Sequence, residues 1–237
     1  LQITPNGQCF AFHIKDAKGN KLDNITDWGL QQFQTHYKNK KINKEDIFNY
    51  VYGVLHNPAY RKKYELNLRR EFPRIPFYED FKKWSNWGKK LMELHIDYET
   101  VKPFNLKVTE VKPIKKSKGE KLFEEVKEPE VLYKYTAKVK AKLKADKEKG
   151  IIELDEVTSL SGIPKEAWEY KLGNRSALEW ILDQYKEKKP SDPTIAEKFN
   201  TYRFADYKEQ VIDLLKRVCT VSVETMKIIE DMKGEKG

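Results

Sequence analysis

The stretch Asp46–Pro76 constrains the fold more than any other part of the chain, because it combines a regular apolar pattern with two signals for the start of a helix. Asn43 stands three residues before Asp46, which is the spacing of a capping box. Apolar residues then recur at the 3.6-residue period of a buried helix face, at Ile47, Val51, Val54 and Leu55. The pattern predicts one helix that ends before Pro58.

A second helix is expected directly after the first. Asn57 can cap it through its side-chain oxygen, and Pro58 suits the first turn, where a missing N–H costs nothing. We therefore predict a helix over Ala59–Arg70, followed by an extended segment between Pro73 and Pro76. The predicted helix carries five basic residues: Arg61, Lys62, Lys63, Arg69 and Arg70.

Two further patterns make the N-terminal half helical. A helix through Tyr37 is expected to turn Trp28, Phe33 and Tyr37 inward. A third strong helix covers Glu79–His95, and Gly88 within it marks either close packing or a bend, since glycine costs a helix about 1 kcal/mol relative to alanine.

The middle of the chain changes to a strand pattern. Phe104–Val111 alternates as a half-buried strand does. Alternation then continues from Ala137 to Ala145, and Asp146–Gly150 and Ile151–Val157 supply a turn and a return strand, which together predict a β-hairpin. One face of its first strand carries four lysines over roughly 20 Å, at about 3.3 Å per residue: Lys138, Lys140, Lys142 and Lys144.

The positive charge is concentrated in the same region. The range 102–150 holds fifteen lysines, no arginine and eight acidic residues, so it carries +7 of the chain's net charge of +9. Such a stretch favours a polyanion partner, most simply nucleic acid. Two alternatives are a solvated lysine-rich surface, and pairing of the lysines with Glu153 and Asp155, worth about 0–1 kcal/mol per exposed pair.

The C-terminal part returns to helices. A loop over Gly173–Ser176 precedes a helix over Ala177–Tyr185, with Ser176 as its cap. Later helices are expected over Asp192–Phe199, from a capping box at Asp206 and Glu209 to Cys219, and over Val221–Met232. The predicted fold class is therefore α+β, with helical N-terminal and C-terminal parts around a small central antiparallel β region.

Composition limits the class of protein. A chain of 237 residues with 39% hydrophobic residues can bury one substantial core or two small ones. No run approaches the roughly 20 apolar residues of a membrane span, and no signal peptide opens the chain, so a cytoplasmic location without membrane contact is expected. Cys9 and Cys219 are interpreted as reduced packing residues. A first residue that is Leu1 rather than Met suggests a piece of a longer protein.

The sequence contains little that predicts catalysis. Asn57-Pro58-Ala59-Tyr60 is similar to the Asn-Pro-Pro-Tyr motif of N6-adenine DNA methyltransferases, but it stands between two predicted helices and no glycine-rich cofactor loop follows a strand. P-loop, His-Glu-x-x-His and G-x-S-x-G patterns are absent from the sequence. An enzyme acting alone is disfavoured, and no catalytic or metal-binding residue is predicted.

Several separated blocks, taken in order, identify a family. They are NITDWGLQQFQTHY, DIFNYVYGVLHNPAYRKKYELNLRREFPRIPFY, WGKKLMELHIDYETV and the long block that begins GIPKEAWEYKLGNRSALEWILDQY. Over Asn24–Met232 the chain resembles the C-terminal target-recognition region of type ISP restriction-modification enzymes. Such enzymes join a nuclease, a helicase-like ATPase and an N6-adenine methyltransferase to a DNA-reading domain in one polypeptide.

The resemblance implies a division of the chain and of the chemistry. Residues 1–23 would end a preceding methyltransferase-like region, 24–101 and 161–237 would be helical parts of the recognition domain, and 102–160 its basic β region. Partners would be double-stranded DNA and the upstream methyltransferase and helicase/nuclease domains. The cofactors S-adenosylmethionine, ATP and Mg²⁺ would serve the parent enzyme, with none in this chain.

We therefore expect this chain to recognise a specific duplex DNA sequence. The hairpin lysines would contact phosphates, and Asn174 and Arg175, with Asn200 and Arg203 behind them, would read base edges, because Asn and Arg make bidentate contacts to adenine and guanine. The alternative is a helical protein-interaction or coupling module of the same enzyme that contacts DNA only non-specifically.

Overall fold

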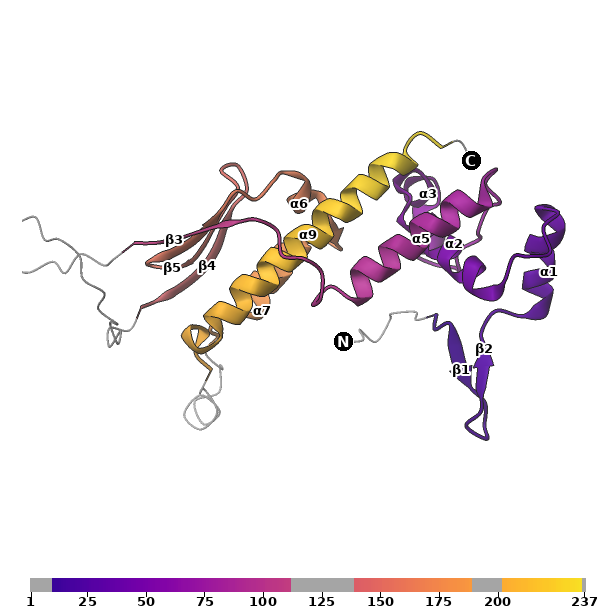
Figure 1. Cartoon of the computed structure of the whole chain (residues 1–237), viewed down its shortest axis with the longest axis horizontal. Coiled ribbons are helices and arrows are strands. Elements are labelled where there is room, and N and C mark those ends of the chain that lie inside the picture. Colours follow the sequence, from indigo (N-terminus) through magenta and orange to yellow (C-terminus); the bar gives the residue numbers. More distant parts are fainter. Residues whose placement is uncertain (1–9, 112–138, 189–201, 236–237) are drawn as a thin grey trace, which may run out of the picture. The chain divides into compact units, whose positions relative to one another are not determined.

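The computed structural model describes residues 10–111, 139–188 and 202–235 (Figure 1). The chain divides into two compact units, one formed by Leu1–Tyr98 with Glu224–Gly237 and the other by Glu99–Val223. Helices dominate the first unit, and a four-stranded antiparallel sheet with helices forms the second. The predicted α+β class is confirmed.

The first unit consists of a small hairpin followed by helices. In chain order these are β1 (His13–Lys15), β2 (Lys21–Asp23), α1 (Asp27–His36), α2 (Lys44–His56), α3 (Pro58–Lys63), α4 (Glu65–Leu68), α5 (Phe81–Ile96) and the last part of α9 (Lys208–Met232). One core cluster, rich in aromatic residues and including Tyr50, Val54, Trp84 and Leu91, holds these helices together.

Both helix starts predicted around Asp46–Pro76 are confirmed. Asn43 Oδ1 accepts the Asp46 N–H at 2.8 Å, and Asp46 Oδ2 accepts the Asn43 N–H at 3.1 Å, which completes the capping box. Asn57 caps the next helix, with Pro58 in its first turn. The prediction of one helix from Ala59 to Arg70 is wrong, because Tyr64 leaves helical geometry (φ −109°, ψ 20°) and separates α3 from α4.

The crossing of α2 and α5 depends on two glycines. A Cβ atom on Gly88 would lie 1.7 Å from the Asn49 carbonyl oxygen, and one on Gly53 would lie 2.8 Å from the Trp84 carbonyl oxygen. The backbones of the two helices therefore approach more closely than any side chain at these positions would allow. Of the two roles expected for Gly88, close packing is the one that the structure shows.

Tyrosine hydroxyls hold the extended segment that follows α4. Tyr60 Oη donates to the Arg74 carbonyl at 2.9 Å, and Tyr50 Oη donates to the Pro76 carbonyl at 2.7 Å. Tyr50 Oη also accepts the backbone N–H of Tyr78 at 2.8 Å. A segment without secondary structure thus has its polar backbone groups satisfied by core side chains.

The prediction that Trp28 faces inward is wrong, since this side chain is 71% exposed. Phe33 and Tyr37 do pack against the core cluster, as expected. Five residues separate Trp28 from Phe33, which at about 100° per residue places the two side chains roughly 140° apart around the helix. A helix that contacts the core through Phe33 and Tyr37 must therefore point Trp28 outward.

A histidine connects α5 to the end of α9 within the first unit. His95 Nδ1 lies 2.8 Å from Tyr52 Oη, and His95 Nε2 lies 2.9 Å from Thr225 Oγ1. Burial, with a smaller effect of the neighbouring His56, lowers the pKa of His95 to about 4. The ring is therefore neutral at pH 7 and acts as a structural bridge.

The second unit is built around the sheet, with strand order β3-β6-β5-β4 and every pair antiparallel. Its elements are β3 (Lys107–Glu110), β4 (Ala141–Asp146), β5 (Ile151–Asp155), β6 (Thr158–Ser161), α6 (Glu166–Glu169), β7 (Lys171–Leu172), β8 (Arg175–Ser176), α7 (Ala177–Gln184), the 3₁₀ helix η1 (Phe204–Tyr207) and the first part of α9. The predicted hairpin is confirmed as β4–β5, and β6 is an additional strand.

Leucines and isoleucines of the sheet pack against α7 and α9 in a second core cluster, which includes Ile152, Leu154, Leu160, Leu178 and Leu215. The buried Cys219 belongs to this cluster as a free thiol, as expected, and burial raises its pKa to about 12. Cys9 and the helix expected over Asp192–Phe199 lie outside the described residues.

The two last helices predicted from the sequence form one helix, α9. The stretch contains neither glycine nor proline, so nothing in it forces a break. Near the expected break, Thr220 Oγ1 donates to the Lys102 carbonyl at 2.8 Å and Ser222 Oγ to the Val218 carbonyl at 2.7 Å. The predicted start at Asp206 is also wrong, because Asp206 lies inside η1 and α9 begins at Lys208.

The glycine contact predicts the effect of a small substitution. Gly88→Ala should destabilise the first unit by about 3 kcal/mol or more, since its methyl group would meet backbone atoms that cannot move aside as a flexible side chain can. Gly29→Ala, also within a helix, is the matched control, because its Cβ would meet Thr26 Oγ1 at an ordinary 3.4 Å. Urea unfolding measures both, and equal stability of the two variants would contradict the close approach of α2 and α5.

Candidate nucleic-acid interface

The β4–β5 hairpin presents lysines on its outer face. Lys142 and Lys144 are exposed on β4, and Lys140 is exposed just before it. Leu143 between them is buried, with 2% of its surface exposed. The predicted separation into a lysine face and an apolar face is therefore present for the described part of the strand. Lys138 lies outside the described residues.

A β-bulge interrupts the strand, so the prediction of one regular strand from Ala137 to Ala145 is corrected. Ala141 pairs with Asp155 and Lys144 with Glu153, which leaves two residues of β4 opposite Leu154. Leu143 accommodates the extra residue with a φ of 45°, in the left-handed region that leucine rarely adopts. A bulge increases the local twist, so the lysines do not follow one straight row.

The acidic residues of the return strand have separate roles. Lys142 Nζ lies 3.6 Å from Glu153 Oε2, and both side chains are nearly half exposed, so this pair contributes at most about 1 kcal/mol. Asp155 does not pair with the described hairpin lysines, so the alternative of lysine pairing holds for Glu153 but not for Asp155. It is buried and lies 3.1 Å from Lys208 Nζ at the start of α9.

Asp155 faces inward because it closes the turn between β5 and β6. Its Oδ1 accepts the backbone N–H groups of Val157 at 2.9 Å and Thr158 at 2.6 Å. Burial would raise the pKa of Asp155, but these hydrogen bonds and the Lys208 ammonium outweigh it and lower the pKa. The residue is part of the scaffold of the sheet.

The expected loop at Gly173–Ser176 is the tip of a small hairpin. Leu172 pairs with Arg175 across a two-residue turn, in which Gly173 has a φ of 73° and Asn174 is exposed. A glycine with positive φ followed by Asn is typical of tight hairpin turns. The turn holds Asn174 at the surface, directly before helix α7.

Neighbouring side chains fix the orientation of Arg175. Its guanidinium carbon lies 5.3 Å from the centre of the Trp180 ring, and its Nη1 lies 3.3 Å from Asp183 Oδ2. Trp180 Nε1 donates to the Leu172 carbonyl at 2.7 Å, which ties the hairpin to α7. The arginine is therefore oriented before any ligand arrives, while 43% of its side chain remains exposed.

Glu179 joins the two basic features. Its Oε2 accepts hydrogen bonds from Ser176 N at 2.9 Å and Ser176 Oγ at 2.8 Å, which makes the capping box of α7. Its Oε1 lies 2.8 Å from Nζ of Lys147, in the turn between β4 and β5. Partial burial would raise the pKa of Glu179, but the bonds from Lys147 and Ser176 outweigh it and lower the pKa to about 2.

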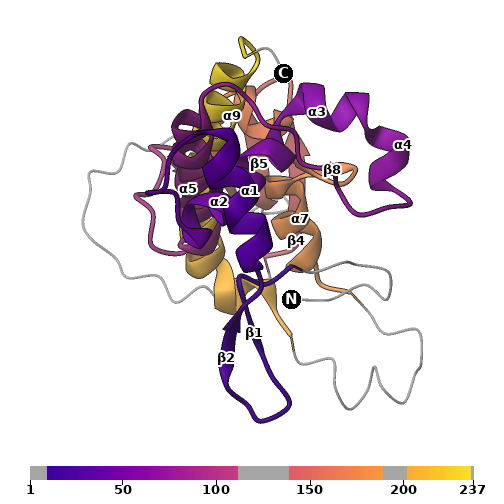
Figure 2. The ribbon, with the colours of Figure 1, turned by 90° about the vertical axis from the view of Figure 1, so that its right-hand side faces the viewer.

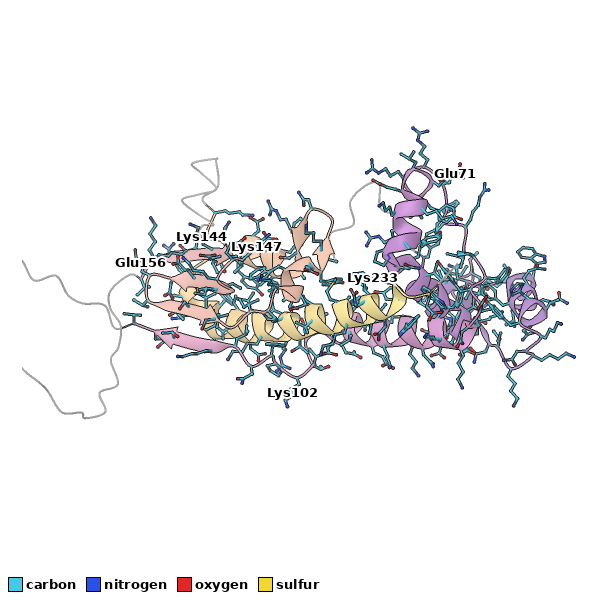
Figure 3. The ribbon with its side chains drawn as sticks, turned by 90° about the horizontal axis from the view of Figure 1, so that it is seen from above. Glu71, Lys102, Lys144, Lys147, Glu156 and Lys233 are labelled. Atoms are coloured by element: carbon cyan, nitrogen blue, oxygen red, sulfur yellow. The ribbon has the colours of Figure 1, made fainter. Side chains whose placement is uncertain are left out.

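Figure 3 shows Lys144 and Lys147 on one side of the second unit and Lys102 on the other. The lysine hairpin and the Asn174–Arg175 turn thus lie beside each other through Lys147 and Glu179. Sequence reasoning missed the roles of Lys147, Glu179 and Trp180. The spacing of Glu179 three residues after Ser176 is the signal that could have indicated one of them.

Arg203 lies at the other end of α7. The exposed Arg203 is followed by Phe204, whose N–H donates to Glu187 Oε1 at 2.9 Å, and preceded by Tyr202, whose Oη donates to the Tyr185 carbonyl at 2.9 Å. Because α7 has eight residues, about 12 Å of helix separates this end from the Arg175 turn. Asn200 lies outside the described residues.

The motif Asn57-Pro58-Ala59-Tyr60 is structural. Asn57 is 1% exposed; its Oδ1 accepts the Ala59 N–H at 2.9 Å, and its Nδ2 donates to Tyr78 Oη at 3.1 Å. Tyr60 is buried and donates to a backbone carbonyl, as described above. These side chains are therefore engaged in the fold of the first unit.

Among residues 10–111, 139–188 and 202–235, no three histidine, cysteine or acidic side chains are placed to hold a metal ion. Within the same ranges, no helix has the length and apolar character needed to span a membrane.

This region combines exposed lysines on a hairpin with an oriented arginine beside a tight turn. Such a combination is typical of a module that binds nucleic acid. The family comparison agrees with this class: the model of the Type ISP C-terminal specificity domain matches residues 1–214. The chain belongs to this family, and the resemblance stated from the sequence is confirmed.

Solved structures agree with the family. The chain is similar to a protein in a cryo-EM structure of a DrdV–DNA complex, with 52% identity over 95% of this chain and a TM-score of 0.83. It is also similar to a nuclease-deletion mutant of the Type ISP restriction-modification enzyme LlaGI in complex with a DNA substrate mimic, with 28% identity over 95% of this chain and a TM-score of 0.60.

A third similar structure is the ATP-dependent Type ISP restriction-modification enzyme LlaBIII bound to DNA, with 25% identity over 93% of this chain and a TM-score of 0.59. The chain covers 21% of the DrdV chain, 18% of the LlaGI chain and 13% of the LlaBIII chain. No curated protein matched the sequence.

Glu179 gives the interface a dependence on pH. Its folded pKa of about 2 lies below the ordinary 4.5, so its stabilising effect is complete above about pH 4.5 and is lost as the pH falls toward 2. Glu179→Gln should therefore destabilise the hairpin and α7 by about 1 kcal/mol at pH 7, allowing for screening at a partly exposed site, and by less at pH 3.

The indole N–H signal of Trp180 in NMR, followed through urea titrations at pH 7 and pH 3, measures this local stability. Glu153→Gln is the matched control, because Glu153 makes only the 3.6 Å exposed pair with Lys142. A Glu179→Gln variant as stable as the wild type at pH 7 would show that Glu179 does not hold the two features together.

Proposed function

We propose that this chain recognises a specific duplex DNA sequence as the target-recognition module of a type ISP restriction-modification enzyme. The observation that carries the proposal is the match of the Type ISP C-terminal specificity domain over residues 1–214. Three similar solved structures, each a complex with DNA or a DNA substrate mimic, support it.

The hairpin lysines supply the part of binding that does not depend on sequence. Lys140, Lys142 and Lys144, together with Lys138, contact phosphates along the duplex backbone and position the module. Only one of the three described lysines has a carboxylate partner among the described residues, and that exposed pair is weak enough for a phosphate to replace it.

Asn174 and Arg175 read base edges. The two-residue turn places them where a narrow element can enter a groove, and Arg and Asn form bidentate contacts to guanine and adenine. Stacking on Trp180 keeps the guanidinium oriented, so less freedom is lost on binding. In the free protein Arg175 forms an ion pair with Asp183. Part of this ion pair must break when Arg175 contacts a base. Arg203, beyond the far end of α7, makes a secondary contact, and Asn200 is proposed to make another.

The rest of the enzyme supplies the chemistry. In this proposal the methyltransferase and the helicase/nuclease domains precede this chain in the same polypeptide, and S-adenosylmethionine, ATP and Mg²⁺ act there, with none bound by this chain. The protein works in the cytoplasm, as the sequence predicts. This chain itself contributes the choice of the DNA site.

The alternative is a coupling module that contacts other domains and touches DNA only non-specifically. The observation that favours it is the exposure of large apolar side chains in the first unit, including Trp28 at 71% and Ile96 at 68%. Exposed apolar surface of this kind is typical of contacts with protein. Binding of equal strength to all duplex sequences would support this alternative over recognition.

The base-reading role of Arg175 predicts a change in specificity. Arg175→Ala should reduce the preference for one base at one position of the target by about 5- to 150-fold, which corresponds to 1–3 kcal/mol. Fluorescence anisotropy across a set of single-base site variants measures it. Lys89→Ala, which removes an exposed cation of α5 in the first unit, is the control and should leave the preference unchanged. An unchanged base preference in Arg175→Ala would show that Arg175 does not read a base.

The lysines predict a change in salt dependence. The slope of log K against log salt is negative, and each phosphate contact contributes about −0.9 to it. Replacing Lys140, Lys142 and Lys144 by Gln should therefore make the slope less steep by about 2 to 3. The matched control replaces Lys102, Lys107 and Lys165, three exposed lysines of the second unit that lie off the β4–β5 hairpin. If both triple variants have the same slope, the hairpin is not a phosphate-contact surface.

A further inference from the structure

The segment Arg61–Arg74, which we call the basic arm, carries charge that the base-reading site does not explain. It contains six basic residues and only two acidic ones, Glu65 and Glu71, and all eight side chains belong to exposed residues. Its net charge of +4 is concentrated in fourteen residues of the first unit. The six basic residues are Arg61, Lys62, Lys63, Arg69, Arg70 and Arg74.

Ion pairs account for only part of this charge. Glu65 pairs with Arg69 at 2.6 Å, and Glu71 with Arg74 at 3.5 Å. Among the residues that the structure describes, no carboxylate lies within 4.0 Å of the cationic groups of the other four, which are Arg61, Lys62, Lys63 and Arg70. In the second unit, Lys142, Lys147 and Arg175 each have a carboxylate partner, whereas Lys140 and Lys144 have none among the described residues.

Hydrogen bonds and core contacts hold the backbone of the basic arm in place. Asn57 caps its first helix, and Tyr60 donates to the Arg74 carbonyl at 2.9 Å, which ties the two ends of the arm together. Tyr64, Leu68 and Ile75 pack against the core of the first unit. Figure 2 shows α3 and α4 set to one side of α1, α2 and α5. The cations therefore extend from an ordered support.

Two ordinary explanations do not account for the whole arrangement of this surface. Cations at the C-terminal end of a helix interact favourably with its dipole, and this applies to Arg61, Lys62 and Lys63 in the last turn of α3. Arg70 follows α4, outside its last turn, and has no carboxylate partner among the described residues. Leu66, 72% exposed, stands among these cations, while Phe72, 65% exposed, packs edge-on against Phe10.

We propose that the basic arm is a second DNA-contact surface, which binds phosphates of the duplex backbone independently of base sequence. The proposal rests on the function proposed above, since it takes duplex DNA as the partner. Successive residues on α3 point about 100° apart, so Arg61, Lys62 and Lys63 spread over roughly 200°. That spread suits several phosphates of a curved backbone better than one bound anion, and in this arrangement the exposed Leu66 would contact sugars between them.

The test removes three of the unpaired charges from the whole 237-residue chain. Arg61→Gln/Lys62→Gln/Lys63→Gln should make the slope of log K against log salt for duplex binding less steep by about 2 to 3. Its affinity should fall by the same factor for target and non-target duplexes, since phosphates carry no sequence information. The matched control, Lys82→Gln/Lys89→Gln/Lys90→Gln, removes three positive charges from exposed positions on α5 of the same unit.

The outcomes separate this proposal from the recognition function. A slope that equals that of the control overturns the basic arm as a DNA surface, whatever the wild type's sequence preference. A less steep slope in a protein without sequence preference supports the basic arm and contradicts base recognition. Failure of the wild-type chain to bind any duplex at low salt would contradict both.

A crosslinking measurement at saturating DNA tests which residues of the bound protein lie next to the duplex. Leu66 is replaced by the photoreactive p-benzoylphenylalanine, and Trp28 of the same unit, with a similar exposed fraction, is replaced as the control. Irradiation with a labelled duplex should give a protein–DNA crosslink from position 66 and little from position 28. Equal yields at the two positions, or none at position 66, would overturn the proposal.

Discussion

The interface described above depends on the carboxylate of Glu179. One of its oxygens caps α7 through Ser176, and the other accepts the ammonium of Lys147 from the β4–β5 turn. A carboxylate that receives several charge-assisted hydrogen bonds stays ionised, and its pKa of about 2 expresses that. This contact adds a polar link between the lysine hairpin and α7, which already share one hydrophobic core. With it, phosphate contacts and base contacts can be made by one piece of structure.

In the first unit, too, a rigid core supports exposed basic side chains. Tyr50 and Tyr60 hold the backbone that follows α4, and Gly88 allows α5 to approach α2 closely. Asn57 and Tyr60, the residues most similar to a catalytic motif, also make structural contacts in this unit. The exposed cations of the basic arm are left available for a partner, in the way that loops on a stable scaffold carry function.

Local rules predicted the parts of this protein that depend on neighbouring residues. The capping boxes and caps at Asn43, Asn57 and Ser176 follow from residue types within a few positions, and each is present. The β4–β5 hairpin followed from period-two alternation. What the sequence could not predict involves distant partners: Asp155 pairs with Lys208, and the bulged Leu143 lies in the core shared by the sheet, α7 and α9. Trp28 was mispredicted because aromatic character alone does not show which side of a helix meets the core.

The central claim is that the Asn174–Arg175 turn meets base edges while the hairpin lysines meet phosphates. The most direct test is a structure of the chain bound to a duplex that contains its target site, found by selection from a random library. The account predicts Asn174 or Arg175 within hydrogen-bond distance of a base in a groove, with Lys142 or Lys144 beside the backbone. A complex in which this turn points away from the DNA would contradict it.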